Sequence, residues 1–503
     1  MGNKEGAIKW LKKNFMGSDS LSKRKRNNLI ALAAANLATG TFFSEVIGSF
    51  LQFYYTEFLL MSAATVSLVL SVGIFVDGLS DVAMGAILDR FENKHGKIKS
   101  WLLWASIPTA AATILIFMCP EGLSSGGKLA YLFITYNLYS LCLTAVRMPG
   151  STIISMGFRD PEARQVAGVT NGLFSQLGQL VVTSGMPVLI AALGSTAAAY
   201  QITNGIFSSV GVLFCLLAYA TLKEVHGSKA SVEYVRQTEG AEAGDIARKI
   251  YEKEKNSAPG EKKKNRNVLA DLKKLVSNKY WLLMQVVSMA NSIGIGFMFG
   301  VAAYFTTYIL GNMAYLGAIY GTLSIGMMVG IFMAAPLIVK LDSRFVGILG
   351  SFVAAIGMGI AAIGIMVMDK NMTVFYAGLF IRQLGTGCLI AIQNDITARV
   401  IDYGEWKDGI RLDGLTFSGT SVMSKIMSAL ATALLGFVLT ATGYVGGAQS
   451  LAPSAVSAIQ TLFLIVPGAA CAVGGISYIF FDLSNTRIIN IRAEIAERAK
   501  NNE

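Results

Sequence analysis

The chain has 503 residues, of which 53% are hydrophobic and only 15% are charged, whereas a soluble domain has about 25% charged residues. This composition excludes an ordinary soluble domain and indicates a membrane protein. The net charge of +11 could suggest nucleic acid, but the basic residues are distributed as in a protein whose partner is a lipid bilayer, and we expect no nucleic-acid partner.

Apolar segments of about 20 to 30 residues recur along the chain, which is the length that crosses the hydrocarbon core of a bilayer as a helix. Because backbone polar groups in lipid must be satisfied within each segment, we expect an all-α membrane protein. Twelve spans are predicted, at residues 28–54, 59–88, 100–119, 129–157, 166–194, 198–222, 281–310, 316–339, 345–368, 373–397, 415–443 and 455–481.

The basic residues predict which side of the membrane each connection occupies. If the N-terminus lies inside, 37 of the 42 Lys and Arg residues fall in cytoplasmic segments, as the positive-inside rule requires. We therefore expect a multi-pass monomer of the cell inner (cytoplasmic) membrane with both termini in the cytoplasm. Its predicted parts are a basic N-terminal segment (1–27), a six-helix bundle (28–222), a cytoplasmic central loop (223–280), a second six-helix bundle (281–481) and a cytoplasmic tail (482–503).

The second predicted span contains two carboxylates at membrane depth. Asp77 and Asp81 lie one helical turn apart with Ser80 beside them, so three oxygen-bearing side chains converge. A charge at mid-membrane costs about 3 kcal/mol, so such residues point to function. Two neighbouring carboxylates share a proton or bind a cation, and either behaviour indicates a coupling-ion site. The alternative is a structural ion pair with Arg147 or Lys425.

The sequence has no metal-ligand cluster, no phosphate-binding glycine motif and no nucleophilic triad. Its two histidines, His95 and His226, fall in predicted cytoplasmic loops. We therefore expect no enzymatic activity and no cofactor, apart from a coupling ion that is Na⁺ or H⁺.

Motifs in both halves carry a family resemblance. GAILDRFENKHGKIK, after the second span, resembles the loop that latches the two halves of major facilitator superfamily transporters. DGLSDVAMGAILDR and HGKIKSWLLW, together with VIDYGEWKDGIR at 400–411, resemble the glycoside-pentoside-hexuronide:cation symporter family over residues 25–485. The resemblance implies the twelve-helix fold of that superfamily and cation-coupled sugar transport by alternating access. The gate residues expected from these motifs are Asp89, Arg90, Asp402, Glu405 and Arg411.

The same resemblance implies a cation site. Asp77 and Asp81 match the family's two aspartates, and Thr144 matches its threonine. Ser80 stands where the family has an asparagine, which leaves the choice between Na⁺ and H⁺ open. Lys425 matches a lysine near the family's cation site and is expected to take part in coupling.

The sugar site departs from the family pattern seen in melibiose permease. Its charged sugar-binding positions align with Gly40, Thr41, Arg147 and Asn171. A buried arginine such as Arg147 or Arg382 offers a planar fork suited to a carboxylate, which predicts an anionic sugar derivative, a hexuronide or glucuronide. In the alternative account the acidic and basic residues neutralise one another, and the substrate is a neutral glycoside. The candidates for substrate binding are Glu45, Arg147, Asn171 and Arg382.

A second function remains open. Relatives in the same superfamily branch carry lysophospholipids with sodium, so the alternative is a cation-coupled transporter of a lysolipid or another amphiphile. A charged pocket under an apolar cavity would suit a lipid headgroup, and competition between substrates would separate the two functions.

Overall fold

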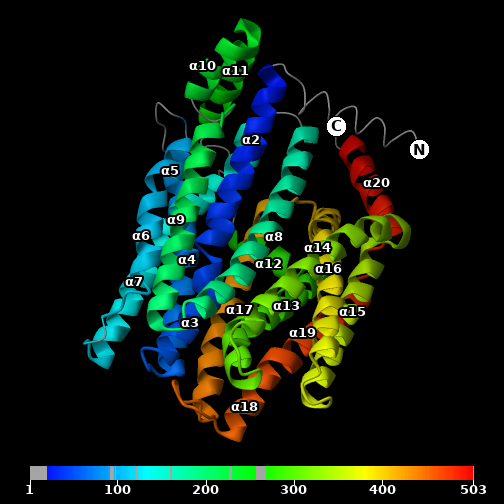
Figure 1. Cartoon of the computed structure of the whole chain (residues 1–503). Coiled ribbons are helices and arrows are strands. Elements are labelled where there is room, and N and C mark those ends of the chain that lie inside the picture. The colour runs from blue at the N-terminus through cyan, green and yellow to red at the C-terminus, as the bar shows by residue number, and fades with distance from the viewer. Residues whose placement is uncertain are drawn as a thin grey trace. The chain divides into compact units, whose positions relative to one another are not determined.

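The computed structural model describes residues 20–90, 96, 98–120, 122–158, 161–225, 229–256 and 268–501 (Figure 1). Within these ranges no β-strand occurs, and eleven helices are long and apolar enough to cross a membrane. The all-α membrane fold expected from the composition is therefore confirmed.

The span predicted at 100–119 differs from the other predicted spans. It forms two shorter helices, α5 (Lys99–Trp104) and α6 (Ser106–Leu115). Pro108 lies near the start of α6 and has no backbone N–H to donate to the carbonyl of Trp104, so a continuous helix is disfavoured at this point. The third apolar segment is helical but interrupted.

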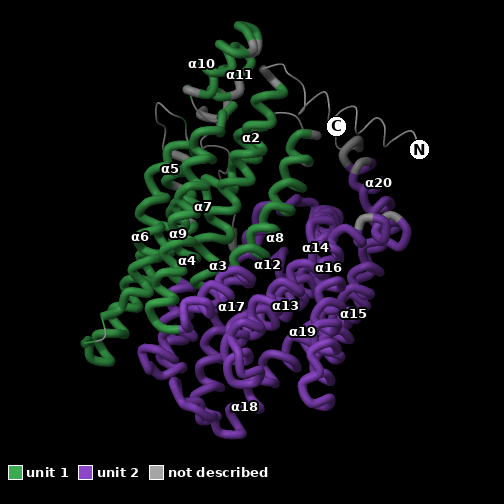
Figure 2. The backbone as a smooth tube through the Cα atoms, viewed as in Figure 1, with its two compact units in different colours: residues 1–47, 76–182, 196–264 green, residues 48–75, 183–195, 265–503 purple. Residues whose placement is uncertain are grey.

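The chain divides into two compact units (Figure 2). Unit 1 comprises residues 1–47, 76–182 and 196–264, and unit 2 comprises residues 48–75, 183–195 and 265–503. The predicted bundles therefore differ from these units at 48–75 and 183–195. The first of these segments is joined to the rest of unit 2 by hydrogen bonds from Ala64 N to Thr440 Oγ1 at 3.0 Å and from Ser71 Oγ to the carbonyl of Ala429 at 2.9 Å.

Unit 1 contains α5 and α6, and it shares α3, α4 and α8 with unit 2. Two further helices, α10 and α11, fall in the predicted central loop and form a hairpin beyond the end of α9 (Figure 1). The hairpin turns at Gly240, whose φ of +98° is a conformation that favours glycine. The other helical elements are α2 (Ser20–Asn36), the π-helical turn η1 (Leu37–Phe42), α3 (Glu45–Glu57), α4 (Ala63–Arg90), α7 (Ser125–Gly157), α8 (Pro161–Ala192), α9 (Ala197–Thr221), α10 (Lys229–Glu239) and α11 (Ala241–Asn256).

Unit 2 is organised around two helices, α15 and α16, that pack closely through glycines. A Cβ atom at Gly357 would lie 2.3 Å from the backbone nitrogen of Arg382, and one at Gly385 would lie 2.2 Å from the carbonyl oxygen of Gly350. Only small residues allow this approach of two backbones. The helical elements are α12 (Val268–Val276), α13 (Lys279–Tyr304), η2 (Phe305–Ile309), α14 (Tyr315–Leu341), α15 (Ser343–Met366), α16 (Met372–Asp408), α17 (Asp413–Ala441), α18 (Pro453–Gln460), η3 (Thr461–Ile465), α19 (Val466–Ile479) and α20 (Asn485–Asn501).

Candidate functional site

The acidic pair lies on α4 in unit 1, and α7 supplies hydrogen-bond donors to it. Asp77 Oδ1 accepts hydrogen bonds from Ser140 Oγ at 2.7 Å and from Thr144 Oγ1 at 3.2 Å. Thr144 Oγ1 also lies 3.1 Å from Asp81 Oδ1, so one hydroxyl contacts both carboxylates. The two aspartate side chains are only 19% and 23% exposed. The structure therefore brings together three of the four residues predicted for the cation site.

Ser140 was not predicted from the sequence, and Ser80 lies differently from the expectation. The Ser80 hydroxyl donates to the backbone carbonyl of Asp77 at 2.9 Å, which is a bond within its own helix. Ser140 takes a place beside Asp77 instead. Residues 140, 144 and 147 follow one another at intervals of four and three, so they share a face of α7, and this spacing was the sequence signal for Ser140.

Arg147 is a counter-ion of the acidic pair. Its Nη2 atom lies 3.6 Å from Asp81 Oδ2 and 3.8 Å from Asp77 Oδ2. Its side chain is 41% exposed, so the guanidinium is held on one side only. These contacts match the alternative in which a structural ion pair satisfies the aspartates, and they also place a cation where the carboxylates would otherwise attract one.

The donor set restricts what can bind between α4 and α7. Two carboxylates and two hydroxyls offer oxygen ligands, which are the ligands that hard cations such as Na⁺ or Ca²⁺ take in proteins. The Thr144 hydroxyl has a single proton and can donate to one carboxylate at a time. Its contact with the second carboxylate is a hydrogen bond only if that carboxyl carries the proton, so this arrangement is also compatible with a proton shared by the pair.

Two other candidates for substrate binding in unit 1 are engaged by neutral amides. Glu45, at the start of α3, is hydrogen-bonded to the side chain of Gln179 on α8. Asn171 Oδ1, also on α8, accepts a hydrogen bond from Asn36 Nδ2 at 2.8 Å. These bonds join the first predicted span to the fifth. That Glu45 and Asn171 bind the substrate stays a prediction.

The remaining basic candidates lie in unit 2. Arg382 is only 2% exposed, and one of its guanidinium nitrogens donates to Gln383 Oε1. Among the residues that the structure describes, no carboxylate pairs with Arg382, and its Nε atom is buried without a hydrogen-bond acceptor. Lys425 is half-buried on α17. The predicted roles of Arg382 in substrate binding and of Lys425 in coupling stay predictions.

The gate residues of the second half form an ion-pair network in unit 2. Arg411 Nη1 lies 3.0 Å from Asp402 Oδ1 and 2.8 Å from Glu405 Oε2. Arg492 of α20 lies 2.7 Å from Asp402 Oδ2, so the helix of the predicted tail is tied to the end of α16. The side chains of the other two gate candidates, Asp89 and Arg90 at the end of α4, lie outside the described residues.

Glu57, at the end of α3, was given no role from the sequence but is the centre of a second polar cluster in unit 2. Its carboxylate accepts hydrogen bonds from Tyr308 Oη at 2.8 and 2.9 Å, from Tyr444 Oη, and from the backbone nitrogen of Gly447 at 2.9 Å. We refer to these four residues as the Glu57 cluster. Within unit 2, the cluster therefore links the end of α3, which was assigned to the first predicted bundle, to residues of the second predicted bundle.

We expect Glu57→Gln to loosen this link. A neutral amide oxygen accepts weaker hydrogen bonds than a carboxylate, so about 2 kcal/mol should be lost over the three donors. The readout is a cysteine at the buried position Ala303 (Ala303→Cys), in a background without the native cysteines. Its reaction with an impermeant maleimide added from outside should become roughly thirtyfold faster when Glu57→Gln is introduced. Glu252→Gln on α11 is the matched control, and equal labelling of both variants would show that the cluster does not restrict access to position 303.

Comparisons with known proteins give a consistent result. A family model described as MFS/sugar transport protein matches residues 32–485. The inner membrane symporter YicJ of Escherichia coli (strain K12) is 25% identical over 486 residues, which cover 96% of each chain. The isoprimeverose transporter of Lactiplantibacillus pentosus is 24% identical, covering 87% of this chain and 85% of that protein. The solved structure of a D-xylose-proton symporter resembles this one with a TM-score of 0.62 at 11% identity, over 91% of this chain and 97% of that one, which supports the fold alone.

Proposed function

The chain belongs to the MFS/sugar transport protein family, and from that membership we propose that it is a cation-coupled symporter of a sugar derivative. It is a multi-pass membrane transporter and not an enzyme. We further propose that both termini are cytoplasmic, that the protein acts as a monomer in the lipid bilayer, and that the coupling ion is Na⁺ or H⁺.

The observation that carries this proposal is the acidic pair with its donors on α7. A transporter that uses a cation gradient needs a site where the cation replaces an existing interaction, because a tight structural ion pair would exclude it. The contacts of Arg147 with the pair, at 3.6 and 3.8 Å, are longer than the roughly 2.7 to 2.9 Å of a tight charge-assisted hydrogen bond. A cation that binds Asp77 and Asp81 can therefore displace the Arg147 guanidinium at low cost.

Displacement of Arg147 would couple the cation to the substrate. Once a cation neutralises the carboxylates, the guanidinium is released and its N–H donors can bind a substrate group. By linkage, a substrate that holds Arg147 away from the aspartates strengthens cation binding by the same factor. Two six-helix halves that alternate in access would then carry both ligands together down the cation gradient.

The released arginine also favours a substrate class. A planar guanidinium suits a carboxylate, so we propose an anionic sugar derivative such as a glucuronide as the preferred substrate. A neutral glycoside is the alternative, and one relative is named an isoprimeverose transporter.

Uptake into proteoliposomes tests the proposal. Labelled methyl glucuronide and the matched methyl glucoside are offered under an inward Na⁺ gradient or an inward proton gradient. We expect accumulation of the glucuronide with one of the two gradients and little accumulation of the glucoside. If the glucoside accumulates as well or better, the substrate is neutral, and if neither sugar accumulates with either gradient, sugar symport is wrong.

A further inference from the structure

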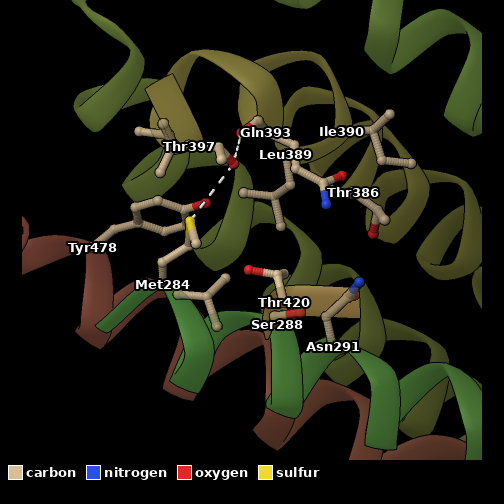
Figure 3. Close-up of a pocket in the computed structure, with 12 residues that line it drawn as sticks. Met284, Ser288, Asn291, Thr386, Leu389, Ile390, Gln393, Thr397, Thr420 and Tyr478 are labelled. Atoms are coloured by element: carbon tan, nitrogen blue, oxygen red, sulfur yellow. Dashed lines mark hydrogen bonds between the residues drawn. The ribbon is translucent and has the colours of Figure 1, made fainter. Parts of the chain in front are cut away.

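A cavity of about 610 Å³, part of it open to solvent, lies in unit 2 among α13, α16, α17 and α19 (Figure 3). None of the side chains that line this cavity carries a charge. Half of them are polar, namely Ser288, Asn291, Thr386, Gln393, Thr397 and Thr420.

The serine and threonine hydroxyl groups of the cavity are already hydrogen-bonded within the protein. Thr420 Oγ1 donates to the carbonyl of Thr416 at 3.0 Å and accepts from Gln285 Nε2 at 2.9 Å. Thr397 Oγ1 donates to the backbone carbonyl of Gln393 at 2.9 Å. These hydroxyl groups can therefore still accept a hydrogen bond from a ligand, but they cannot donate one, because each proton is already donated within the protein.

Two amides of the cavity are not used in this way. The side chains of Asn291 on α13 and Gln393 on α16 are exposed, and they have no hydrogen-bond partner among the residues that the structure describes. Figure 3 shows both amide groups directed into the cavity from facing helices. Each amide presents two donors and one acceptor oxygen, which is the set that matches neighbouring hydroxyl groups of a sugar.

The apolar residues of the cavity lining suit the apolar faces of a sugar ring. Met284, Val287 and Leu389 line the cavity together with the ring of Tyr478. A sugar ring has apolar faces and a polar rim, whereas an acyl chain would leave the polar side chains unpaired at a cost in free energy. An ion would find no charged ligand here, which distinguishes this cavity from the acidic pair in unit 1.

We propose that this cavity binds the uncharged, hydroxyl-bearing ring of the transported substrate, and that Asn291 and Gln393 select its hydroxyl groups. The inference rests on the proposed function as a sugar symporter. It assigns recognition of the ring to unit 2, separately from the charged residues on α4 and α7.

The test compares Asn291→Leu and Gln393→Leu with the wild type in proteoliposomes. Leucine has nearly the same size as these amides but makes no hydrogen bonds. Each substitution should raise KM for the transported sugar about tenfold, while the cation concentration for half-maximal uptake stays unchanged. Gln237→Leu, on the exposed helix α10, is the matched control and should leave KM unchanged.

A labelling experiment gives a readout that does not depend on transport rate. Asn291→Cys, in a background without the native cysteines, should react with a hydrophilic maleimide, and the transported methyl glycoside should slow the reaction at least fivefold. Gln237→Cys should show no protection. If the wild type accumulates no sugar, the proposed function fails. If it accumulates sugar but the leucine variants keep KM within twofold and Asn291→Cys is not protected, this inference alone is overturned.

Discussion

Replacing Asp77 by Asn is expected to abolish concentrative uptake of sugar. The carboxylate of Asp77 accepts two hydroxyl hydrogen bonds and faces Arg147, so the substitution removes one of the two charged groups able to bind a cation. Loss of a partly buried charged ligand costs about 3 kcal/mol, which is roughly a hundredfold in cation affinity. Uptake by the variant under an inward cation gradient should fall to the level of liposomes without protein, as measured by filtration with labelled sugar.

The control for this experiment must remove a carboxylate without touching the site. Asp245→Asn, on the helix α11, meets this condition and should accumulate sugar like the wild type. Downhill exchange of sugar is a second readout, since a variant that still exchanges sugar is folded and has lost only its coupling. Full accumulation by Asp77→Asn, with an unchanged cation requirement, would show that the aspartate pair is a structural ion pair.

Much of the fold could be predicted because each span has a local physical requirement. An apolar segment must be long enough to cross the bilayer whatever packs around it, and Pro108 removes one backbone donor near the point where the third segment is interrupted. The association of residues 48–75 with unit 2 has no such local origin. It depends on contacts such as Ser71 with Ala429, and these reflect which helix ends meet, a property of packing between segments far apart in the sequence.

The candidate site shows the same division. Asp77 and Asp81 could be singled out because a carboxylate within an apolar span is costly. Ser140 has no such energetic cost and only its helical spacing to Thr144 pointed to it, since a serine in a helix commonly bonds its own backbone. Glu57 was overlooked because charge is cheap at the end of a span, and its tyrosine partners lie 251 and 387 residues away along the chain.

Arg147→Gln is expected to have two opposite effects. If the substrate is an anionic sugar derivative, the loss of a charge-assisted partner should reduce glucuronide uptake by roughly a hundredfold, since such contacts are worth about 3 kcal/mol. At the same time the aspartates lose their counter-ion, so cation binding should strengthen. With about 1.4 kcal/mol regained, the cation concentration for half-maximal binding should fall about tenfold.

Measuring both cation binding and glucuronide uptake identifies the role of Arg147, because each possible role predicts a different combination of the two results. An arginine that is both counter-ion and substrate ligand predicts tighter cation binding together with lost glucuronide uptake, and Arg147→Lys should recover only part of that uptake because it lacks the planar fork. An arginine that serves only as counter-ion predicts tighter cation binding with substrate affinity retained. Arg248→Gln, on exposed α11, should change neither quantity. Weaker cation binding in Arg147→Gln would contradict the exchange mechanism itself, since a guanidinium 3.6 Å from Asp81 must compete with any cation that this carboxylate binds.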